Sequence, residues 1–179
     1  MKPGHLLGRL AFHTAFLFIR TAGLFSHQLY MRLYLPLLKA AGMRFDGKPR
    51  YIGARVEFDD FRLIALGDRT VISDRCRLVT HDYSYTTARI AAGKPLRTDT
   101  ALIRGITLGN NVFVGTGSLL LPGTEIGNDV VIGAGSVVRG RIPDGSVVAG
   151  NPAAVLRSIH EQAVKWDTLP ASRLRSDKR

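Results

Sequence analysis

Residues 106–138 decide the fold, and they read ITLGNNVFVGTGSLLLPGTEIGNDVVIGAGSVV. In this stretch an aliphatic residue returns every six positions, a glycine often follows it, and a small or branched residue stands four positions after it. The aliphatic positions are Leu108, Val114, Leu120, Ile126, Ile132 and Val138. A six-residue period fits neither the 3.6-residue repeat of an α-helix nor the plain alternation of one long strand.

A short strand followed by a tight corner, repeated many times, explains this period. Each aliphatic residue would point inward, and Gly or Asn would adopt the backbone angles that the corner demands. Three such units close one turn of a triangular prism, and stacked turns pair their strands in parallel around an aliphatic column. The same step is already present at Leu66, Ile72 and Leu78, so the sequence predicts a mainly β chain built as a parallel β-helix.

The stretch from about Gly53 to Leu156 resembles the hexapeptide-repeat acyltransferases. The residues that carry the resemblance are 106–115, Pro122-Gly123, 132–136, Ile142-Pro143 and 150–153. The resemblance implies a left-handed β-helix, which is an exception to the usual right-handed crossover. It is greatest to the branch that acetylates sugars, polysaccharide precursors and some antibiotics.

Three segments are predicted. Residues 1–48 form a hydrophobic and basic helical segment with a break at Gly23, residues 49–156 form the β-helix domain with a loop at about 82–104, and residues 157–179 form a short helix and basic tail. No window in the first segment reaches 18 apolar residues, so a spanning helix is not expected. Its amphipathic helices are predicted to lie on the inner membrane surface, with covering of the core end alone as the alternative.

The charge supports the first of these interpretations. The chain carries 25 Lys and Arg against 14 Asp and Glu, for a net charge of +11, but residues 51–156 are nearly neutral and the excess lies at the two ends. A nucleic-acid domain would be expected to carry a basic stripe across the fold, so nucleic acid is not a predicted partner. Basic, apolar ends favour an acidic membrane surface. A single cysteine, Cys76, excludes a disulfide scaffold and a thiolate zinc site and favours the cytoplasm.

His81 is the predicted catalytic base. Transfer of an acetyl group from a thioester to a hydroxyl needs a base near that hydroxyl, a donor for the oxyanion and a dry groove. His81 stands where the repeat breaks and is the only histidine between residues 28 and 159. The resemblance implies that a histidine in this place deprotonates the acceptor. The other four histidines lie outside the repeat, so zinc held by three histidines is not expected and no metal is predicted.

An acidic side chain is expected to fix the tautomer of His81. Asp60 is the predicted partner, with the adjacent Asp59 as the other candidate and a solvated corner carboxylate as the structural alternative. Residues 52, 58 and 64 run two positions out of phase with Leu66, so the register in this region is open.

The resemblance implies that acetyl-CoA lies along a groove between two subunits of a homotrimer. The residues it assigns to the co-substrate are Phe113, Gly115, Thr116, Gly133, Ala134, Arg139 and Arg157. The small residues would meet the pantetheine arm and the two arginines would lie near the phosphates. Phe113 stands where many members have Trp, and Arg139 replaces a frequent Thr. The glycines are equally explained as corner residues.

The loop after His81 is predicted to shape the acceptor pocket. Asp82, Tyr83, Tyr85 and Arg89 are its candidate residues, because tyrosines stack on sugar rings and arginines pair with phosphate. A solvated basic loop is the alternative.

These observations predict a trimeric, cytoplasmic O-acetyltransferase that moves acetyl from acetyl-CoA to a sugar hydroxyl of a bacterial surface polysaccharide or its precursor. The oxygen would attack the thioester directly, without an acyl-enzyme. Two alternatives stay open. One is the same chemistry on an amino sugar, serine or an antibiotic, and the other is a non-catalytic β-helix scaffold.

Overall fold

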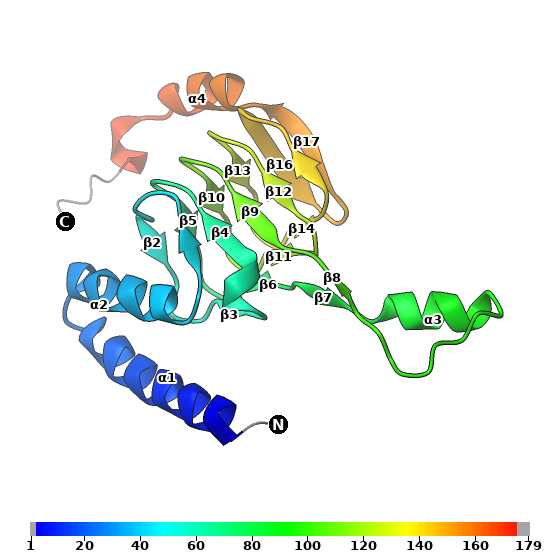
Figure 1. Ribbon diagram of the computed structural model, residues 1–179. Coiled ribbons are helices and arrows are strands. Elements are labelled where there is room, and N and C mark those ends of the chain that lie inside the picture. Colours follow the sequence, from blue (N-terminus) through cyan, green and yellow to red (C-terminus); the bar gives the residue numbers. More distant parts are fainter. Residues whose placement is uncertain (1–2, 175–179) are drawn as a thin grey trace.

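The body of the molecule is a prism of short, stacked strands (Figure 1). The computed structural model describes residues 3–174. Sheet A contains β1 (Arg44–Phe45), β4 (Ile64–Leu66), β9 (Ile106–Leu108), β12 (Glu125–Ile126) and β15 (Arg141–Ile142). Sheet B contains β2 (Tyr51–Ile52), β5 (Val71–Ile72), β10 (Phe113–Val114), β13 (Val131–Ile132), β16 (Ser146–Gly150) and β17 (Ala153–Ser158). Sheet C contains β3 (Glu57–Phe58), β6 (Arg77–Leu78), β11 (Leu119–Leu120) and β14 (Val137–Val138).

The aliphatic positions of the repeat lie directly above one another. In sheet B, Ile52 pairs with Ile72, Ile72 with Val114, Val114 with Ile132 and Ile132 with Val148, all in parallel strands. Each of these five side chains is completely buried. The predicted fold class, a mainly β chain of stacked hexapeptide coils, is therefore confirmed.

The small position of the repeat is also buried, and its hydroxyl groups are satisfied. The hydroxyls of Thr70, Ser118, Thr124 and Ser136 each donate to the carbonyl oxygen three residues earlier, at 2.6–2.8 Å. Each of these buried hydroxyls thus has a hydrogen-bond partner at the corner of its own coil.

The prism begins earlier than residue 49. β1 pairs in parallel with β4, so Arg44 and Phe45 already belong to the first coil. Between Phe58 and Leu66 the step is eight residues instead of six, because a short 3-10 turn, η1 (Phe61–Leu63), is inserted at the corner. This insertion is the physical reason why residues 52 and 58 run out of phase with Leu66.

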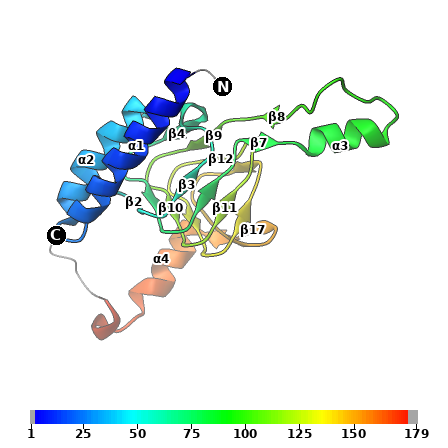
Figure 2. The same ribbon diagram turned by 90° about the horizontal axis from the view of Figure 1, so that it is seen from below.

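Two helices cover the first coil. α1 (Pro3–Ala22) and α2 (His27–Ala40) form a hairpin that lies against the end of the prism where the first coil stands (Figure 1 and Figure 2). Aromatic contacts hold this arrangement: the ring centroids of Phe16 and Tyr34, 4.9 Å apart, join α1 to α2, and those of Phe12 and Phe61, 5.0 Å apart, join α1 to the coil. The buried Tyr30 hydroxyl donates to the carbonyl of Ile52 at 2.9 Å. Within residues 3–174, neither these helices nor any other could cross a bilayer by length and apolar content.

An arm interrupts the prism after sheet C. β7 (His81–Asp82) and β8 (Leu102–Ile103) leave as an antiparallel pair, and the segment predicted as a loop contains a helix, α3 (Ser84–Ala91). The Thr86 hydroxyl and the backbone of Thr100 exchange two hydrogen bonds, at 2.8 and 3.0 Å, which tie the helix to the returning chain. The arm projects far from the prism (Figure 1).

The chain turns back at the other end of the prism. β17 pairs antiparallel with β16 and runs across the predicted segment boundary at residue 157. It leads into α4 (Ile159–Asp167), which starts with a reciprocal capping box between Ser158 and Glu161. A short turn, η2 (Ala171–Arg173), follows.

Candidate active site

His81 is held by an aspartate from the preceding coil. Asp59 Oδ2 lies 2.6 Å from His81 Nδ1. The same oxygen accepts hydrogen bonds from the backbone N–H of Thr80 at 3.1 Å and from the Thr80 hydroxyl at 3.2 Å. A carboxylate at Nδ1 selects the tautomer that carries its proton there, which leaves Nε2 to accept a proton.

The environment keeps Asp59 ionised. Partial burial opposes the charge, but the hydrogen bonds from His81 and Thr80 outweigh it and hold the pKa of the Asp59 carboxyl below its usual value. Asp59 therefore presents a carboxylate, and not a carboxylic acid, to His81 Nδ1.

Asp60, the predicted partner of His81, makes a different set of contacts. Its carboxylate binds the Arg62 guanidinium at 2.7 and 3.1 Å and accepts the backbone N–H of Arg62 at 3.0 Å. The hydrogen bonds from Arg62 lower the pKa of Asp60 despite the opposing effect of burial. Asp60 therefore caps the inserted turn η1, and Asp59 is the residue that contacts His81.

A pocket of about 410 Å³ opens beside His81 on the outer face of sheet C. Its lining includes Glu57, Asp59, Arg77, His81 and Tyr83. Glu57 and Arg77, which are neighbours in adjacent coils, form an exposed ion pair at 2.8 Å. The His81 side chain is 31% exposed, so the ring reaches solvent while Asp59 fixes one of its nitrogens.

The structure separates the four predicted acceptor residues. Tyr83 lines the His81 pocket. Asp82 accepts the backbone N–H of Ser84 at 2.8 Å, and hydrogen bonding to Ser84 lowers the pKa of the Asp82 carboxyl. Tyr85 and Arg89 lie further out, on α3. In the described part of the chain, the buried Nε of Arg89 has no hydrogen-bond partner.

Most of the residues predicted for the co-substrate gather where sheet B turns into sheet C. Thr116 and Ala134 are exposed there in adjacent coils, and Gly135 N–H donates to the Thr116 carbonyl at 2.9 Å. The Thr116 hydroxyl itself donates to the carbonyl of Asp74 at 2.6 Å. Close packing between coils by itself requires a glycine at position 115, because a Cβ there would come within 2.5 Å of the Ala134 nitrogen. A Cβ on Gly133 would meet that of Ala149 at 2.7 Å.

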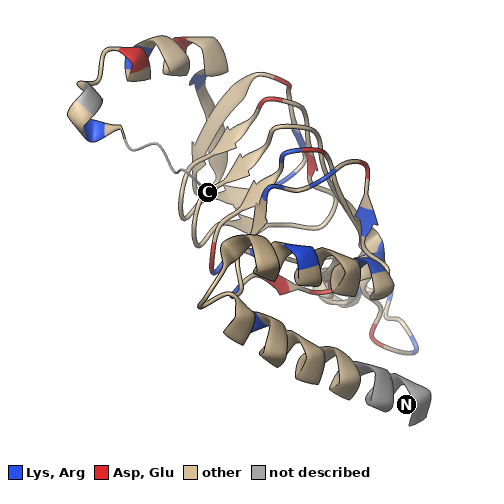
Figure 3. Cartoon of the chain, turned by 90° about the vertical axis from the view of Figure 1, so that its left-hand side faces the viewer, with Lys and Arg blue, Asp and Glu red and all other residues tan. Residues whose placement is uncertain are grey.

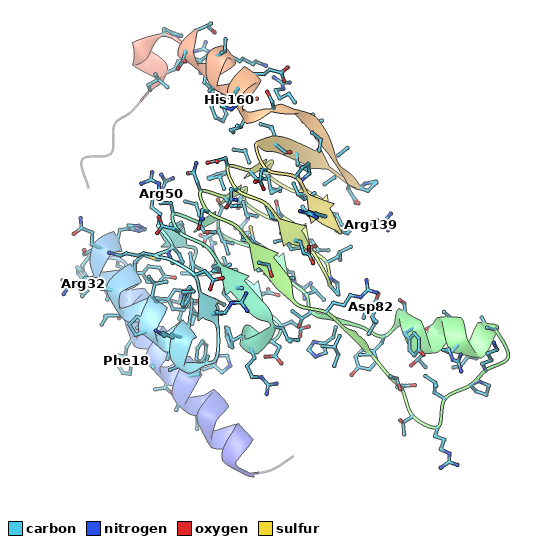
Figure 4. All side chains as sticks on the ribbon, turned by 45° about the horizontal axis from the view of Figure 1, so that its top comes forward. Phe18, Arg32, Arg50, Asp82, Arg139 and His160 are labelled. Atoms are coloured by element: carbon cyan, nitrogen blue, oxygen red, sulfur yellow. The ribbon has the colours of Figure 1, made fainter. Side chains whose placement is uncertain are left out.

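The remaining three candidates lie at different places. Phe113 projects from sheet B with 40% of its surface exposed. Arg157 lies on β17, paired with Val147. Arg139 follows β14 at the corner between sheets C and A, the edge of the prism from which the arm also leaves (Figure 4). Across residues 3–174, no cluster of three His, Cys, Asp or Glu side chains could hold a metal ion.

Comparisons with known proteins agree with the fold. The family model described as bacterial transferase hexapeptide (six repeats) matches residues 105–140. No curated protein matches the sequence closely enough to count as a relative.

Solved structures share the fold over most of the chain. A maltose O-acetyltransferase from Clostridium difficile 630 is 18% identical over 83% of this chain and 88% of its own, with a TM-score of 0.55. A galactoside acetyltransferase in complex with coenzyme A is 24% identical over 92% and 86%, with a TM-score of 0.60. A hexapeptide-repeat acetyltransferase from Vibrio cholerae, complexed with acetyl coenzyme A, is 19% identical over 88% and 90%, also with a TM-score of 0.60. The chain thus carries the bacterial transferase hexapeptide repeat, on the fold that these acetyltransferases share.

Proposed function

We propose that the protein is an acetyl-CoA-dependent O-acetyltransferase that acts on a sugar hydroxyl of a bacterial surface polysaccharide or its precursor. The observation that carries the proposal is the pair of Asp59 and His81, joined at 2.6 Å at the edge of an open pocket. A partly exposed histidine whose Nδ1 is fixed by a carboxylate is arranged as a general base.

The chemistry follows from this arrangement. His81 Nε2 accepts the proton of the sugar hydroxyl as the oxygen attacks the thioester carbonyl, and a backbone N–H stabilises the oxyanion. When the carbon–sulfur bond breaks, the CoA thiolate leaves and the imidazolium returns its proton to the sulfur. Cys76 takes no part, because it is completely buried and burial raises the pKa of its thiol.

The arrangement of the candidates supports a site completed by a second copy of the chain. His81 lies at the edge between sheets C and A, whereas Thr116 and Ala134 lie at the edge between sheets B and C. About five residues of extended chain, or ~16 Å, separate these edges within one coil. In a homotrimer the edge between sheets B and C of one subunit would face the neighbouring subunit. Acetyl-CoA bound in the groove between the two would bring its thioester to the His81 of that neighbour.

The names of the similar structures support the acceptor class. Two of them are acetyltransferases of the sugars maltose and galactoside, and two were solved with coenzyme A or acetyl-CoA. The proposal also places the enzyme in the cytoplasm, in peripheral contact with the inner face of the membrane through the α1–α2 hairpin.

Thermal unfolding with and without acetyl-CoA tests the proposal. A ligand at 100 times its Kd adds about 2.7 kcal/mol to the free energy of unfolding, so the midpoint should rise clearly. The His81→Ala variant should show the same rise, because it keeps the groove, but should release no CoA thiol in the presence of sugar acceptors. A midpoint indifferent to millimolar acetyl-CoA would favour the non-catalytic scaffold, and a rise with zinc alone would point to a metal site.

A further inference from the structure

The α1–α2 hairpin exposes an unusual amount of apolar surface. Its inner face is formed by Phe12, Phe16 and Ile19 of α1, which pack against α2 and the first coil. The outer face and the turn at residues 23–26 carry large apolar side chains that are 43–88% exposed: Leu10, Leu17, Phe18, Leu24, Phe25, Leu29 and Leu33. Phe25 at 88% and Leu24 at 82% are the extremes, and they stand at the tip of the hairpin.

The charged side chains on the described part of the hairpin are all basic. Residues 3–45 contain no Asp or Glu, whereas Arg20, Arg32 and Lys39 are all exposed on the helices. Figure 3 shows blue but no red along the hairpin. A second copy of the same surface would bring cations against cations, which argues against self-association through this face.

An apolar pocket of about 370 Å³ lies behind the tip. Leu17 and Leu24 form one wall, Tyr51 and Ala54 of the first coil form the other, and Arg20 stands among them. Such a pocket can take an apolar chain while the guanidinium of Arg20 stays close to an anionic head group.

A second, larger hollow of about 830 Å³ shares His27 with the first. Four cationic residues line it: Arg32 from α2, and Lys48, Arg50 and Arg69 from the coil. The one acidic residue in its lining, Asp68, accepts the backbone N–H of Lys48 at 2.9 Å. Arg32 and Arg50 lie on the same side of the molecule (Figure 4).

We propose that this surface docks on an anionic lipid bilayer, with Leu24 and Phe25 inserted among the acyl chains and the basic hollow occupied by lipid phosphates. Amphipathic helices bind membranes through buried apolar area together with attraction to anionic head groups, and both are present here on adjoining surfaces. The inference deepens the proposed function, because a membrane-bound transferase meets lipid-linked glycan precursors at the surface where they are made.

Vesicle flotation tests the docking directly. Wild-type protein should float with phosphatidylcholine vesicles that contain 30% phosphatidylglycerol, and should stay behind with pure phosphatidylcholine. Leu24→Ser with Phe25→Ser should lower the partition coefficient by at least about tenfold, because both side chains would otherwise be buried in lipid. Arg50→Gln with Arg69→Asn should lower it about 25-fold, at roughly fivefold for each basic residue near the surface.

Two double variants serve as matched controls. Val164→Ser with Trp166→Ser removes exposed apolar surface from α4, and Arg141→Gln with Arg173→Gln removes two exposed charges that do not line the hollow. Both should float as the wild type does. If the control pair of arginines lowers binding as much as Arg50 and Arg69 do, net charge alone governs the contact and the phosphate-binding hollow is wrong.

The single tryptophan supplies an internal probe of orientation. Trp166 lies on α4, at the opposite end of the prism from the hairpin (Figure 1). Its emission should not change when anionic vesicles are added to the wild type. In the Phe25→Trp, Trp166→Phe variant, emission should shift to the blue and be quenched by brominated acyl chains. Failure to bind anionic vesicles, a blue shift at Trp166 alone, or a change in molecular mass in place of flotation would each overturn the proposal.

This test is independent of the acetyl-transfer test. The hairpin variants should keep the rise in midpoint with acetyl-CoA, so lost flotation with a retained rise locates the failure in the membrane contact. Flotation without any rise would instead overturn the proposed function and leave the docking intact.

Discussion

Asp59 and His81 are 22 positions apart in the sequence, and the stacking of two coils brings Asp59 Oδ2 to 2.6 Å from His81 Nδ1. The contact depends on the parallel register in which Phe58 pairs with Leu78. Because Asp59 follows β3 of the prism and His81 begins β7, this contact holds the start of the arm against the coil below it.

Replacement of His81 by Ala should lower kcat by about 100- to 10,000-fold, the usual contribution of a general base. His81 is 31% exposed and is not among the buried core residues, so the unfolding midpoint should change little. Release of CoA thiol, measured with a thiol reagent, checks the rate. A variant that keeps the parental rate would remove His81 from the mechanism.

Asp59 and Asp60 provide a matched pair. Asp59→Asn keeps the size of the side chain but loses the carboxylate that holds His81 Nδ1 at 2.6 Å, so kcat should fall on the order of tenfold or more. Asp60→Ala should leave the rate near that of the wild type and instead lower the free energy of unfolding by about 1 kcal/mol, because the cap of η1 is lost. The opposite pattern of rates would restore Asp60 as the partner of His81.

Acid should destabilise the protein through these carboxylates. The pKa values of Asp59 and Asp60 are lowered in the folded state, through hydrogen bonds from His81 and Thr80 and from Arg62 that outweigh the effect of burial. Their contribution is present above the pKa of the unfolded chain, near 4, and is lost as the pH falls through the lower folded values. Urea unfolding between pH 3 and 6 should show this decline, and the Asp59→Asn, Asp60→Asn double variant should show a flatter one.

Cys76 should be dispensable. Its thiol occupies the small buried position of the repeat and donates to the Gly115 carbonyl at 3.2 Å, in the place where Ser118 and Ser136 stand in the next two coils. Cys76→Ser should therefore keep the acetyl-transfer rate and cost about 1 kcal/mol or less in stability. In the wild type, a thiol reagent should label Cys76 only after unfolding, whereas fast labelling of the folded protein would contradict its burial.

The sequence was sufficient for the prism but not for its irregularities. A repeated six-residue step has one physical solution, so the column at Leu108, Val114 and Leu120 could be predicted with its direction of burial. The coil that begins at Arg44 could not, because one inserted turn at η1 shifts everything before it out of phase. A pattern based on spacing loses its register at any insertion.

The same insertion explains why the sequence pattern does not distinguish Asp59 from Asp60 as the partner of His81. With the register open, two adjacent aspartates were equally placed, and only the pairing of Phe58 with Leu78 sets Asp59 beside Thr80 and His81. The helix α3 was hidden for another reason. Its eight residues carry no acidic residue in the first turn and no side-chain cap, so the usual signals of a helix start are missing.

A stack of equivalent coils has no natural length, since every coil offers the same parallel edges to the next one. Here the α1–α2 hairpin covers the first coil, which contains β1, β2 and β3. At the other end, β17 pairs antiparallel with β16 and forms the last strand of sheet B. These two segments cap the ends of a stack whose strands could otherwise pair with those of a neighbouring molecule. The hairpin therefore also protects the strand edges of the first coil, and its removal would expose them to end-to-end pairing with a neighbouring molecule.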